Sequence, residues 1–431
     1  MEIKRDYYLN KLIERKHNGL IKVITGVRRC GKSYLLTVLF FRHLLNEGVD
    51  ESHIIRFSFD SADDLSLIGE SLLDIRSKNR RVDPEKFLAY VRGKMTDNEN
   101  YYLLLDEVQL LGSFEAVLNG YLRKPNADVF VTGSNAKFLS TDVITEFAGR
   151  GDEVRMYPLS FSEFLSVYNG DRYEALSEYM LYGGIPMVVL RNSPDDKVAT
   201  LKTLFSEIYI RDIVTRHSVK NSGVLEDLLN IVSSSVGSLT NPEKLKNTFH
   251  SVKNSKVTSA TIKKYLDYFE DSFLLESAHR YDIKGKAYIE TPKKYYFSDP
   301  GLRNARLNFR QSEPNHIMEN IIYNELRMRG YSVDVGIVPV AGKNKNGSVS
   351  RMQLEVDFVC NLGSRRYYIQ SAYSIPDDET RAQETRPFAA IDDSFKKIII
   401  TRDVVPAEYD DNGILTLNIF DFLLDKSSLS R

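Results

Sequence analysis

Residues Val23–Leu36 read VITGVRRCGKSYLL, and this stretch decides the fold. Within it, Gly26, Gly31, Lys32 and Ser33 fit the pattern G-x-x-x-x-G-K-S, which follows a strand-length apolar run and precedes an apolar helical run. Such a loop exposes consecutive backbone N–H groups to phosphate oxygens, and the N-terminus of the following helix adds a favourable partial charge. The stretch therefore predicts a site for a nucleotide phosphate.

Each residue of the loop has an expected place at that site. Lys32 is predicted to reach the β- and γ-phosphates, and the Ser33 hydroxyl to ligate Mg²⁺. Cys30 is expected to be a small filler, with a redox-sensing thiol as the alternative. The residues predicted to line the nucleotide beside Lys32 and Ser33 are Gly26, Val27, Arg28, Arg29, Cys30, Gly31 and Tyr34.

Two further segments complete a site of this kind. The run Tyr101–Glu107 (YYLLLDE) ends in Asp106, which can hold Mg²⁺ through water, and Glu107, which can orient and deprotonate the attacking water. Because both acids are present, the sequence favours hydrolysis over binding alone. The next apolar run ends at Ser134 and Asn135, where a polar side chain can position that water; ordinary turn chemistry is the alternative.

Arg150 directly precedes the last apolar run of this region, Asp152–Pro158 (DEVRMYP). An arginine at this place can project onto the γ-phosphate bound by a neighbouring subunit, as a finger supplied in trans. This hypothesis requires a homo-oligomer, and a solvated surface arginine is the alternative.

Five short apolar runs occur up to Pro158, rich in β-branched and aromatic residues and not alternating with polar ones. The pattern is typical of strands buried on both faces of a parallel sheet. The runs are Leu20–Gly26, His53–Phe59, Tyr101–Glu107, Asp128–Ser134 and Asp152–Pro158. With helical stretches between them, they predict an α/β fold whose ligand lies at the carboxyl ends of the strands.

Composition limits the class of protein less than the motifs do. The chain of 431 residues has 58 Lys and Arg against 59 Asp and Glu, a net charge of −1, so overall charge indicates no class of partner. The two cysteines, Cys30 and Cys360, match no metal-ligand spacing and exclude a disulfide framework. A charged start and the lack of a membrane-length apolar run predict a soluble cytoplasmic protein with no membrane partner.

After Pro158 the pattern becomes helical. Residues 160–217 are predicted to form helices broken at Gly183, Gly184 and Pro186. Three further helical signals lie within 223–275, and a strand-turn-strand follows at 274–290. Three helices and then a hairpin are the sequence outline of a winged helix-turn-helix.

This middle region is locally basic. Lysines on a reading helix and a wing suit salt-sensitive contacts with phosphates, and tyrosines can stack or bond to the backbone of a nucleic acid. No arginine or asparagine on the helix indicates base reading, so we expect nonspecific DNA binding; a protein-binding winged helix with a solvated lysine face is the alternative. The residues are Lys244, Lys246, Lys253, Lys256, Lys263, Lys264, Lys284, Lys286, Lys293 and Lys294, with Tyr265, Tyr268, Tyr281 and Tyr288.

The last part of the chain resembles a restriction-endonuclease-like fold, with Glu319 on a helix, Asp357 on a strand and Gln370 on the following strand. A nuclease of that kind needs acidic Mg²⁺ ligands and usually a lysine two residues beyond the last ligand. Here the neutral Gln370 takes a ligand position and Ala372 the lysine position. We therefore expect a catalytically degenerate module that binds or assembles.

Eight segments together resemble the AAA-family ATPases of bacteria and archaea that carry a C-terminal domain of unknown function. The resemblance runs nearly the full length of the chain. The segments are ITGVRRCGKSYLL (24–36), LLLDEVQ (103–109), VTGSNAKFLS (131–140), AGRGDEVRMYPLSFSEFL (148–165), YGGIPMVV (182–189), KKYYFSDPGLRNA (293–305), MENIIYNEL (318–326) and EVDFVC (355–360).

The resemblance implies the site and the domain plan. It implies that Lys32, Ser33, Asp106 and Glu107 are the phosphate, magnesium and hydrolysis residues, with Ser134 or Asn135 as the sensor; for a lid arginine only Arg211 and Arg216 are candidates. The fold class is α/β: a P-loop NTPase parallel sheet with a helical lid, then a winged-helix domain and an α/β restriction-endonuclease-like domain. The expected ranges are 1–165 for the AAA-type ATPase core, 166–220 for the lid, 221–298 for the winged helix and 299–431 for the nuclease-like domain.

Three functions follow from the motifs. The leading hypothesis is an AAA-family ATPase that uses ATP and Mg²⁺ and couples nucleotide state to a C-terminal module acting on DNA. The second is an ATP-controlled signalling or assembly switch that binds protein partners. The third is an ATP-regulated, Mg²⁺-dependent nuclease, which Ala372 disfavours and for which Glu325 and Glu355 could supply missing ligands.

Overall fold

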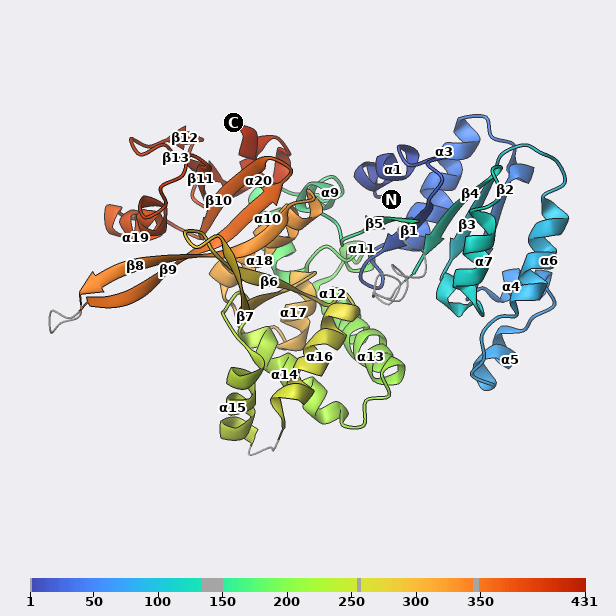
Figure 1. Ribbon diagram of the computed structural model, residues 1–431, viewed down its shortest axis with the longest axis horizontal. Helices are drawn as coiled ribbons and strands as arrows, with labels where there is room; N and C mark the ends of the chain where they lie inside the picture. Colours follow the sequence, from blue (N-terminus) through green and yellow to red (C-terminus); the bar gives the residue numbers. More distant parts are fainter. Residues whose placement is uncertain (1, 134–149, 254–256, 344–348) are drawn as a thin grey trace. The chain divides into compact units, whose positions relative to one another are not determined.

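The structure, a computed structural model, describes residues 2–133, 150–253, 257–343 and 349–431 (Figure 1). Ser134 and Asn135, the predicted sensor residues, lie outside the described residues, as does Lys256. The chain divides into two compact units. The first comprises Met1–Pro158 with Asp271–Phe273, and the second comprises Leu159–Glu270 with Leu274–Arg431.

A five-stranded parallel sheet forms the first unit, in the order β2-β3-β4-β1-β5. Its strands are β1 (Ile21–Thr25), β2 (Ile54–Ser58), β3 (Tyr101–Asp106), β4 (Ala127–Thr132) and β5 (Gly151–Arg155). Each overlaps one of the five predicted runs, and β1 and β3 are buried along their whole length. The predicted parallel α/β sheet is confirmed. Its strands are continuous apolar runs because both faces of a parallel sheet are covered in such a fold.

Helices cover this sheet. They are α1 (Asp6–Ile13), α2 (Lys32–Tyr34), α3 (Phe41–Asn46), α4 (Ala62–Leu67), α5 (Leu72–Ser77), α6 (Pro84–Lys94) and α7 (Phe114–Tyr121), with short 3₁₀ turns at Glu51–His53 and Val108–Leu110. Between α2 and α3 the chain stays helical with π-type hydrogen bonds over Leu35–Phe40, so one helix runs from Lys32 to Asn46.

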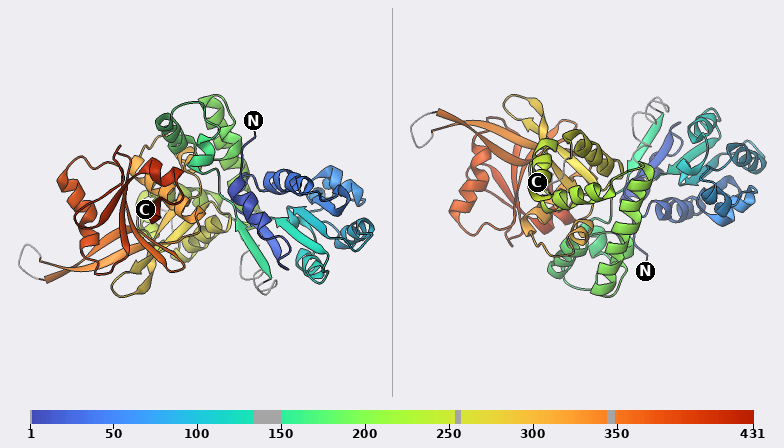
Figure 2. Two further views of the ribbon diagram at one scale, coloured as in Figure 1. Left: turned by 90° about the horizontal axis from the view of Figure 1, so that it is seen from above. Right: turned by 90° about the horizontal axis from the view of Figure 1, so that it is seen from below.

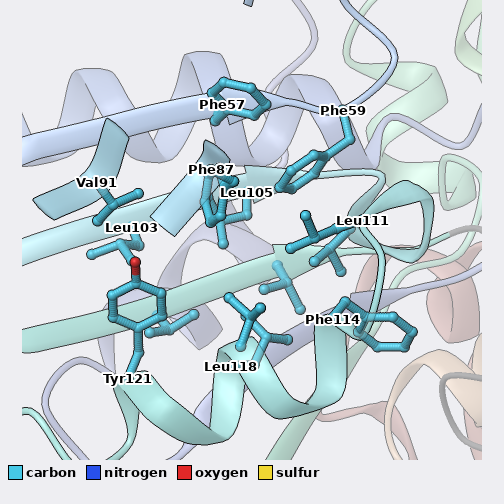
Figure 3. Close-up of a cluster of buried hydrophobic side chains, with 14 of the residues drawn as sticks. Phe57, Phe59, Phe87, Val91, Leu103, Leu105, Leu111, Phe114, Leu118 and Tyr121 are labelled. Carbon is cyan, nitrogen blue, oxygen red and sulfur yellow. The ribbon is translucent and has the colours of Figure 1, made fainter. Parts of the chain in front are cut away.

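One hydrophobic cluster joins the sheet to α6 and α7 (Figure 3). Its labelled members are Phe57, Phe59, Phe87, Val91, Leu103, Leu105, Leu111, Phe114, Leu118 and Tyr121. Burying each side chain of this size contributes roughly 1.5–3 kcal/mol relative to exposure. The cluster fixes β3 in place, and β3 carries Asp106 at its carboxyl end.

The second unit begins with helices. They are α9 (Phe161–Leu165), α10 (Arg172–Tyr182), α11 (Pro186–Val189), α12 (Pro194–Thr203), a π-helical segment (Leu204–Ile210), α13 (Arg211–Arg216), α14 (Ser222–Ser234), α15 (Pro242–Lys253) and α16 (Ser259–Asp271). The predicted break between α10 and α11 is present. Gly183 has φ +75°, and a Cβ atom there would lie 2.0 Å from Oδ1 of Asp299, so only glycine fits.

An eight-stranded sheet completes the second unit, in the order β12-β13-β11-β10-β9-β8-β6-β7. Its strands are β6 (Leu275–Asp282), β7 (Ala287–Phe297), β8 (Ser332–Lys343), β9 (Val349–Leu362), β10 (Arg365–Ala372), β11 (Lys396–Thr401), β12 (Glu408–Tyr409) and β13 (Ile414–Asn418). Its helices are α17 (Pro300–Arg306), α18 (Pro314–Met328), α19 (Asp378–Ala389) and α20 (Ile419–Leu424), with a 3₁₀ turn at Ser428–Ser430.

The predicted hairpin at 274–290 is β6–β7, and it forms the edge of this large sheet. Arg280, Tyr281 and Asp282 of β6 pair in parallel with Val335, Gly336 and Ile337 of β8. The hairpin therefore shares a sheet with the strands that follow it in sequence. Figure 2 shows the β6–β7 and β8–β9 hairpins side by side in two views.

Helices α18 and α19 cover opposite faces of this sheet. Val356 of β9 belongs to the cluster that holds Phe388 of α19. The next residue, Asp357, faces the other way and shares a partner with Glu319 of α18. Glu319 and Asp357, two residues of the predicted nuclease-like site, thus lie on the side of the sheet that α18 covers.

A buried polar joint ties α17 to the helices before it. Asp299 caps α17 and accepts hydrogen bonds from the backbone N–H of Leu302 (3.2 Å) and of Gly184 (2.7 Å). The Asn304 amide donates to the carbonyls of Met180 and Leu181 at the end of α10, both at 2.9 Å. The segments YGGIP and SDPGLRNA are therefore parts of one joint.

Within the described residues, no helix is both long enough and apolar enough to cross a membrane.

Candidate functional site

The loop between β1 and the long helix has the backbone of a phosphate cradle. Gly26 has φ +138°, Arg29 φ +64° and Gly31 φ +102°, so the chain turns back on itself before the helix begins at Lys32. A Cβ atom on Gly26 would lie 2.0 Å from the carbonyl oxygen of Met156, so the close approach of the loop to the end of β5 requires glycine there. Val27 and Cys30 face the interior, while Arg29, Ser33 and Tyr34 are exposed.

Lys32 lies across this loop. Its ammonium donates to the carbonyl oxygens of Gly26 (2.9 Å) and Val27 (3.1 Å), and the residue is only 5% exposed. Both partners are neutral carbonyl oxygens. The negatively charged oxygens of a phosphate would compete with them for the same N–H donors of Lys32. Lys32 is therefore held at the loop with its charge left for an anion.

A chain of side-chain hydrogen bonds joins the loop to the end of β3. The Ser33 hydroxyl donates to Oδ1 of Asp106 at 3.0 Å, and the Thr132 hydroxyl at the end of β4 donates to the same oxygen. Thr132 in turn accepts from the backbone N–H of Glu107 at 3.0 Å. The structure thus brings together Lys32, Ser33, Asp106 and Glu107, as predicted at the carboxyl ends of parallel strands.

Glu107 is in a strained position. Its backbone is left-handed, with φ +52° and ψ +44°, and its carboxylate accepts a hydrogen bond from the Gln109 amide. For a residue with a Cβ atom this conformation costs roughly 1–2 kcal/mol, and such outliers concentrate at functional sites.

Three residues at this site were not predicted from the sequence. Thr132 bridges Asp106 and Glu107, and Ser58 at the end of β2 lies 3.4 Å from Oδ2 of Asp106. Polar residues at the ends of neighbouring strands were the available signal for both. Arg5 carries no such signal, because it precedes the first helix in an unpatterned segment.

Arg5 joins the loop to the segment after β5 through buried hydrogen bonds. Its guanidinium, 3% exposed, donates to the carbonyls of Cys30 (3.2 Å) and Tyr157 (2.7 Å). The Cys30 thiol points inward, 3.6 Å from the carbonyl oxygen of Met156, and is fully buried. Burial on this scale fits the small-filler interpretation of Cys30 and leaves the redox-sensing alternative without an accessible thiol.

Arg150 lies at the opposite end of the strands from the loop. It directly precedes β5, its backbone carbonyl accepts from Ile21 at the start of β1, and its side chain is exposed. The loop follows Thr25, which pairs with Arg155 at the far end of β5, so about 16 Å of strand separates the two. Arg150 is therefore remote from the loop of its own chain. Of the two lid arginines considered, Arg216 forms an ion pair with Asp212 at 2.5 Å within α13.

The predicted nuclease-like residues converge, but around a lysine. The ammonium of Lys294 on β7 lies 2.8 Å from Glu319, 2.8 Å from Glu355 and 3.3 Å from Asp357. Oε1 of Gln370 lies 3.4 Å from the backbone N–H of Asp357, so this residue adjoins the group without entering it. Ala372 is buried in the core.

The remaining partners of these carboxylates are also protein groups. The Tyr296 hydroxyl donates to Glu319 at 2.7 Å, and the backbone N–H of Ser371 donates to Asp357 at 2.9 Å. Glu325, the other acid considered as a ligand, pairs instead with Arg329 at 2.8 Å. We call Lys294, Glu319, Glu355 and Asp357 the lysine–carboxylate cluster.

Electrostatics in the cluster follow from burial and from the shared ammonium. Burial alone would lower the pKa of Lys294, but Glu319, Asp357 and Glu355 outweigh it and raise that pKa. Burial raises the pKa of Asp357, whereas for Glu319 burial is outweighed by the attraction of Lys294 together with hydrogen bonds from His316, Lys294 and Tyr296, so its pKa is lowered. The carboxylates therefore favour the ammonium form of Lys294.

The basic middle region is only partly available to a partner. Lys244, Lys263, Lys264, Lys284 and Lys286 are exposed on α15, α16 and the β6–β7 turn. Lys294 is the correction: it is 3% exposed and committed to the lysine–carboxylate cluster, so it cannot contact DNA. Tyr265 is likewise buried, as its place on the apolar face of α16 requires.

The helix order predicted for this region is present, and α14, α15 and α16 precede the β6–β7 hairpin. Thr240, between α14 and α15, exchanges two backbone hydrogen bonds with Lys293 of β7, at 2.8 and 2.9 Å. The hairpin thus lies against the helices on one side and continues into the large sheet on the other.

With this geometry described, comparisons with known proteins define the class. Residues 18–165 match the model of an AAA domain, and residues 173–313 match a domain of unknown function (DUF8612). The first match spans the loop, Asp106, Glu107 and the whole parallel sheet. Together with the fold, it makes the first unit an AAA-type P-loop ATPase domain.

The full chain has relatives along nearly its whole length. It is 34% identical to an uncharacterized protein of Haemophilus influenzae over 428 residues, which is 98% of both chains. It is 27% identical to an uncharacterized protein of Methanocaldococcus jannaschii over 435 residues, 97% of this chain and 88% of that one. The chain belongs to the same family as the Haemophilus influenzae protein, a family of AAA-domain proteins.

Solved structures are similar only at a distance. The replication initiator DnaA bound to AMPPCP and single-stranded DNA matches with a TM-score of 0.30 and 14% identity, over 61% of this chain and 86% of that chain. The Aeropyrum pernix ORC1 protein in complex with DNA matches with a TM-score of 0.28 and 11% identity, over 72% of this chain and 93% of that chain.

Proposed function

We propose that this chain binds and hydrolyses ATP with Mg²⁺, and that nucleotide state controls what its second unit binds. The observation that carries the proposal is the hydrogen-bonded chain Ser33–Asp106–Thr132–Glu107 next to Lys32. It supports the proposal because a cation suited to phosphate, two oxygens suited to a metal ion and a carboxylate suited to water lie at one edge of one sheet.

The residues present fit ATP and Mg²⁺. The left-handed backbone at Arg29 and Gly31 turns the loop amides toward the helix N-terminus, where they can bind phosphate oxygens. Oxygen ligands are what Mg²⁺ prefers, and Ser33 and Asp106 supply two of them 3.0 Å apart. Mg²⁺ held by these two residues would supply positive charge that neutralises the charge developing on the phosphates.

Each side chain then has one task. Lys32 exchanges its bonds to the Gly26 and Val27 carbonyls for bonds to β- and γ-phosphate oxygens. Glu107 accepts a hydrogen bond from the attacking water and takes its proton as the water oxygen bonds to the γ-phosphorus, while the bond from that phosphorus to the β–γ bridging oxygen breaks and ADP leaves. Thr132 holds Asp106 and Glu107 at a fixed separation, because it bonds to both.

Arg150 completes the site in a neighbouring subunit. It is exposed and lies about 16 Å of strand away from the loop of its own chain, so it can act on a γ-phosphate only in trans. We therefore propose a homo-oligomer in which each nucleotide is bound by one subunit and contacted by Arg150 of the next.

The second unit is proposed to bind DNA through its exposed lysines. Lys263 and Lys264 lie on α16, and Lys284 and Lys286 in the turn of the β6–β7 hairpin, where a winged helix would place a reading helix and a wing. Contacts of this type are to phosphates, so binding is expected to be nonspecific in sequence and sensitive to salt.

One observation favours a protein partner instead. Several groups that would contact nucleic acid are engaged within the chain: Lys246 pairs with Glu243, and the Tyr288 hydroxyl donates to Asp334 at 3.1 Å. Acidic Asp267 and Glu290 are exposed in the same elements. A mixed-charge face of this kind suits a folded partner better than a phosphate backbone.

Steady-state ATP hydrolysis with Mg²⁺ decides between these, measured with and without duplex and single-stranded DNA. We expect DNA to stimulate turnover, and Glu107→Gln to abolish it while nucleotide binding persists. The double variant Lys263→Gln/Lys264→Gln should lower the salt slope of DNA binding by about 2, with Lys124→Gln in the first unit as the matched control. Turnover indifferent to DNA would favour the protein-binding switch, and absence of turnover would reduce the site to nucleotide binding.

A further inference from the structure

The lysine–carboxylate cluster has the composition of a metal site but not its spacing. Carboxylate oxygens bind Mg²⁺ at about 2.0–2.1 Å and demand near-octahedral geometry. Here three carboxylates surround the ammonium of Lys294 at 2.8, 2.8 and 3.3 Å, which are hydrogen-bond distances. Among the residues that the structure describes, no group of three or more His, Cys, Asp or Glu side chains is placed to hold a metal ion.

The number of partners also matches an ammonium. A lysine has three N–H donors; the ammonium of Lys294 donates to Glu319 and Asp357 and forms an ion pair with Glu355. The carboxylate oxygens accept further bonds from Tyr296 (2.7 Å) and from the backbone of Ser371 (2.9 Å). The buried charges are therefore both paired and hydrogen-bonded, which is the condition under which such a group is stable.

The position of the Lys294 side chain is fixed by its burial and by the pairing of its strand. Its side chain is 3% exposed, and it comes from β7, which is fastened to β6 on one edge and to Thr240 through the neighbouring Lys293. Gly237 closes the cluster from the turn after α14: a Cβ atom there would lie 3.1–3.2 Å from the Glu319 carboxylate. Only Glu355, at 35% exposure, opens the cluster to solvent.

We propose that Lys294 is the resident cation of this cluster and takes the position that Mg²⁺ would need, so that the cluster joins the β6–β7 hairpin to α18 and β9 in place of a metal site. The nuclease alternative fails on this geometry, because its metal position is filled by a side chain of the same chain. The fold that resembled a nuclease is instead held together by an internal ammonium.

The substitution Lys294→Met tests this, since it removes the charge and keeps most of the volume. Three carboxylates are then left facing one another without their cation, and we expect Tm to fall by roughly 10 °C. We expect Mn²⁺, used as the probe without nucleotide, to restore part of that Tm in Lys294→Met and to leave the wild-type Tm unchanged. Adding Asp357→Asn to Lys294→Met should remove the Mn²⁺ effect.

Lys293→Met is the matched control, because Lys293 is adjacent, pairs with Thr240 through its backbone, and directs its charge at Glu270 and not at the lysine–carboxylate cluster. Its Tm should stay near wild type with and without Mn²⁺. Wild-type protein that binds one Mn²⁺, with binding lost in Asp357→Asn, would overturn the proposal, as would a Lys294→Met protein that keeps the wild-type Tm.

The proposal stays testable if Lys294→Met does not fold. Electron paramagnetic resonance of Mn²⁺ with the wild-type chain then decides: binding that Asp357→Asn abolishes overturns it, and no such binding, with a folded Lys293→Met, supports it. None of these measurements uses ATP turnover, so they stand or fall independently of the proposed ATPase.

Discussion

Lys32 in the first unit and Lys294 in the second are both buried ammonium groups, 5% and 3% exposed, but the charges around them differ. Lys32 donates to two neutral carbonyl oxygens of its own loop. Lys294 lies among three carboxylates. A buried lysine whose partners are neutral still has a charge to give to a ligand, whereas one whose donors are taken by carboxylates serves the fold. The partner charge, more than burial, separates a binding site from a structural one.

The largest effect is expected from the first of these lysines. Lys32→Met should lower ATP turnover at least about 1,000-fold, because it removes the charge opposite the transferring phosphate, and should leave Tm nearly unchanged, because only bonds to two carbonyls are lost. Lys294→Met is the matched variant with the opposite pattern. A Tm loss in Lys32→Met as large as that in Lys294→Met would break the comparison.

The next effect concerns the charge that the neighbouring subunit supplies. Arg150→Ala should reduce turnover roughly 100-fold or more while nucleotide affinity stays near wild type, since the side chain is exposed and far from its own loop. Mixing Arg150→Ala with Lys32→Met protein should restore activity, because some interfaces then combine an intact loop with an intact arginine. Unchanged turnover of Arg150→Ala at high protein concentration would contradict the finger in trans.

A smaller effect is expected at the bridge between the two acids of the first unit. Thr132→Val keeps the shape but removes the hydroxyl that bonds to Asp106 and to the Glu107 N–H. Leaving that N–H unpaired costs about 1–3 kcal/mol, and we expect turnover to fall about tenfold through kcat, with KM little changed. Thr132→Ser, which keeps the hydroxyl, should retain most of the activity. Equal turnover in the two variants would show that the bridge does not position Glu107.

The smallest effect comes from a buried carboxylate that has backbone donors in place of a lysine. Burial raises the pKa of Asp299 to about 7, against the N–H groups of Gly184, Leu302 and Gly301. Because the folded chain then holds this proton more tightly than the unfolded chain, the free energy of unfolding falls as pH rises from about 4 to 7 and is flat above. Urea unfolding between pH 5 and 8 should show this contribution as a slope that is smaller in Asp299→Asn than in the wild type, the remainder coming from other buried carboxyl groups such as Asp357.

Asp267→Asn, at an exposed position of α16, is the control for that slope and should keep it. A wild-type stability that rises between pH 5 and 7 in parallel with Asp299→Asn would show that Asp299 is ionised throughout. The carboxylate of Asp299 would then be ionised without a lysine beside it, and the contrast between this joint and the lysine–carboxylate cluster would fail.

The first unit was largely predictable from local patterns. Its strands are continuous apolar runs, and the loop signature places Gly26, Lys32 and Ser33 by their spacing alone. Asp106 and Glu107 follow because they end a buried run. Arg5 was not predictable, since its bonds to the Cys30 and Tyr157 carbonyls join positions 25 and 152 residues away.

The second unit was predictable in its elements but not in its assembly. The hairpin pattern at 274–290 is local, whereas its pairing with β8 is set by which sheet edge is free after folding. Lys294 stood among ten lysines that read alike, and its carboxylate partners lie 25 to 63 residues further along. The sequence therefore showed that Ala372 replaces the lysine expected two residues after Gln370. It did not show that Lys294 faces Asp357.

The sheet shared by the β6–β7 hairpin and the strands after it also determines how this protein can be dissected. A fragment ending at Ser298 would keep the hairpin but lose β8, and a fragment beginning at Asp299 would expose the backbone of β8 along the segment that β6 covers. Unpaired edges of this kind recruit strands from other molecules and promote aggregation. The best place to divide the chain is after Pro158, where the long segment of the first unit ends; only Asp271–Phe273 of that unit then stay with the second, and the whole of 159–431 should be expressed as one piece.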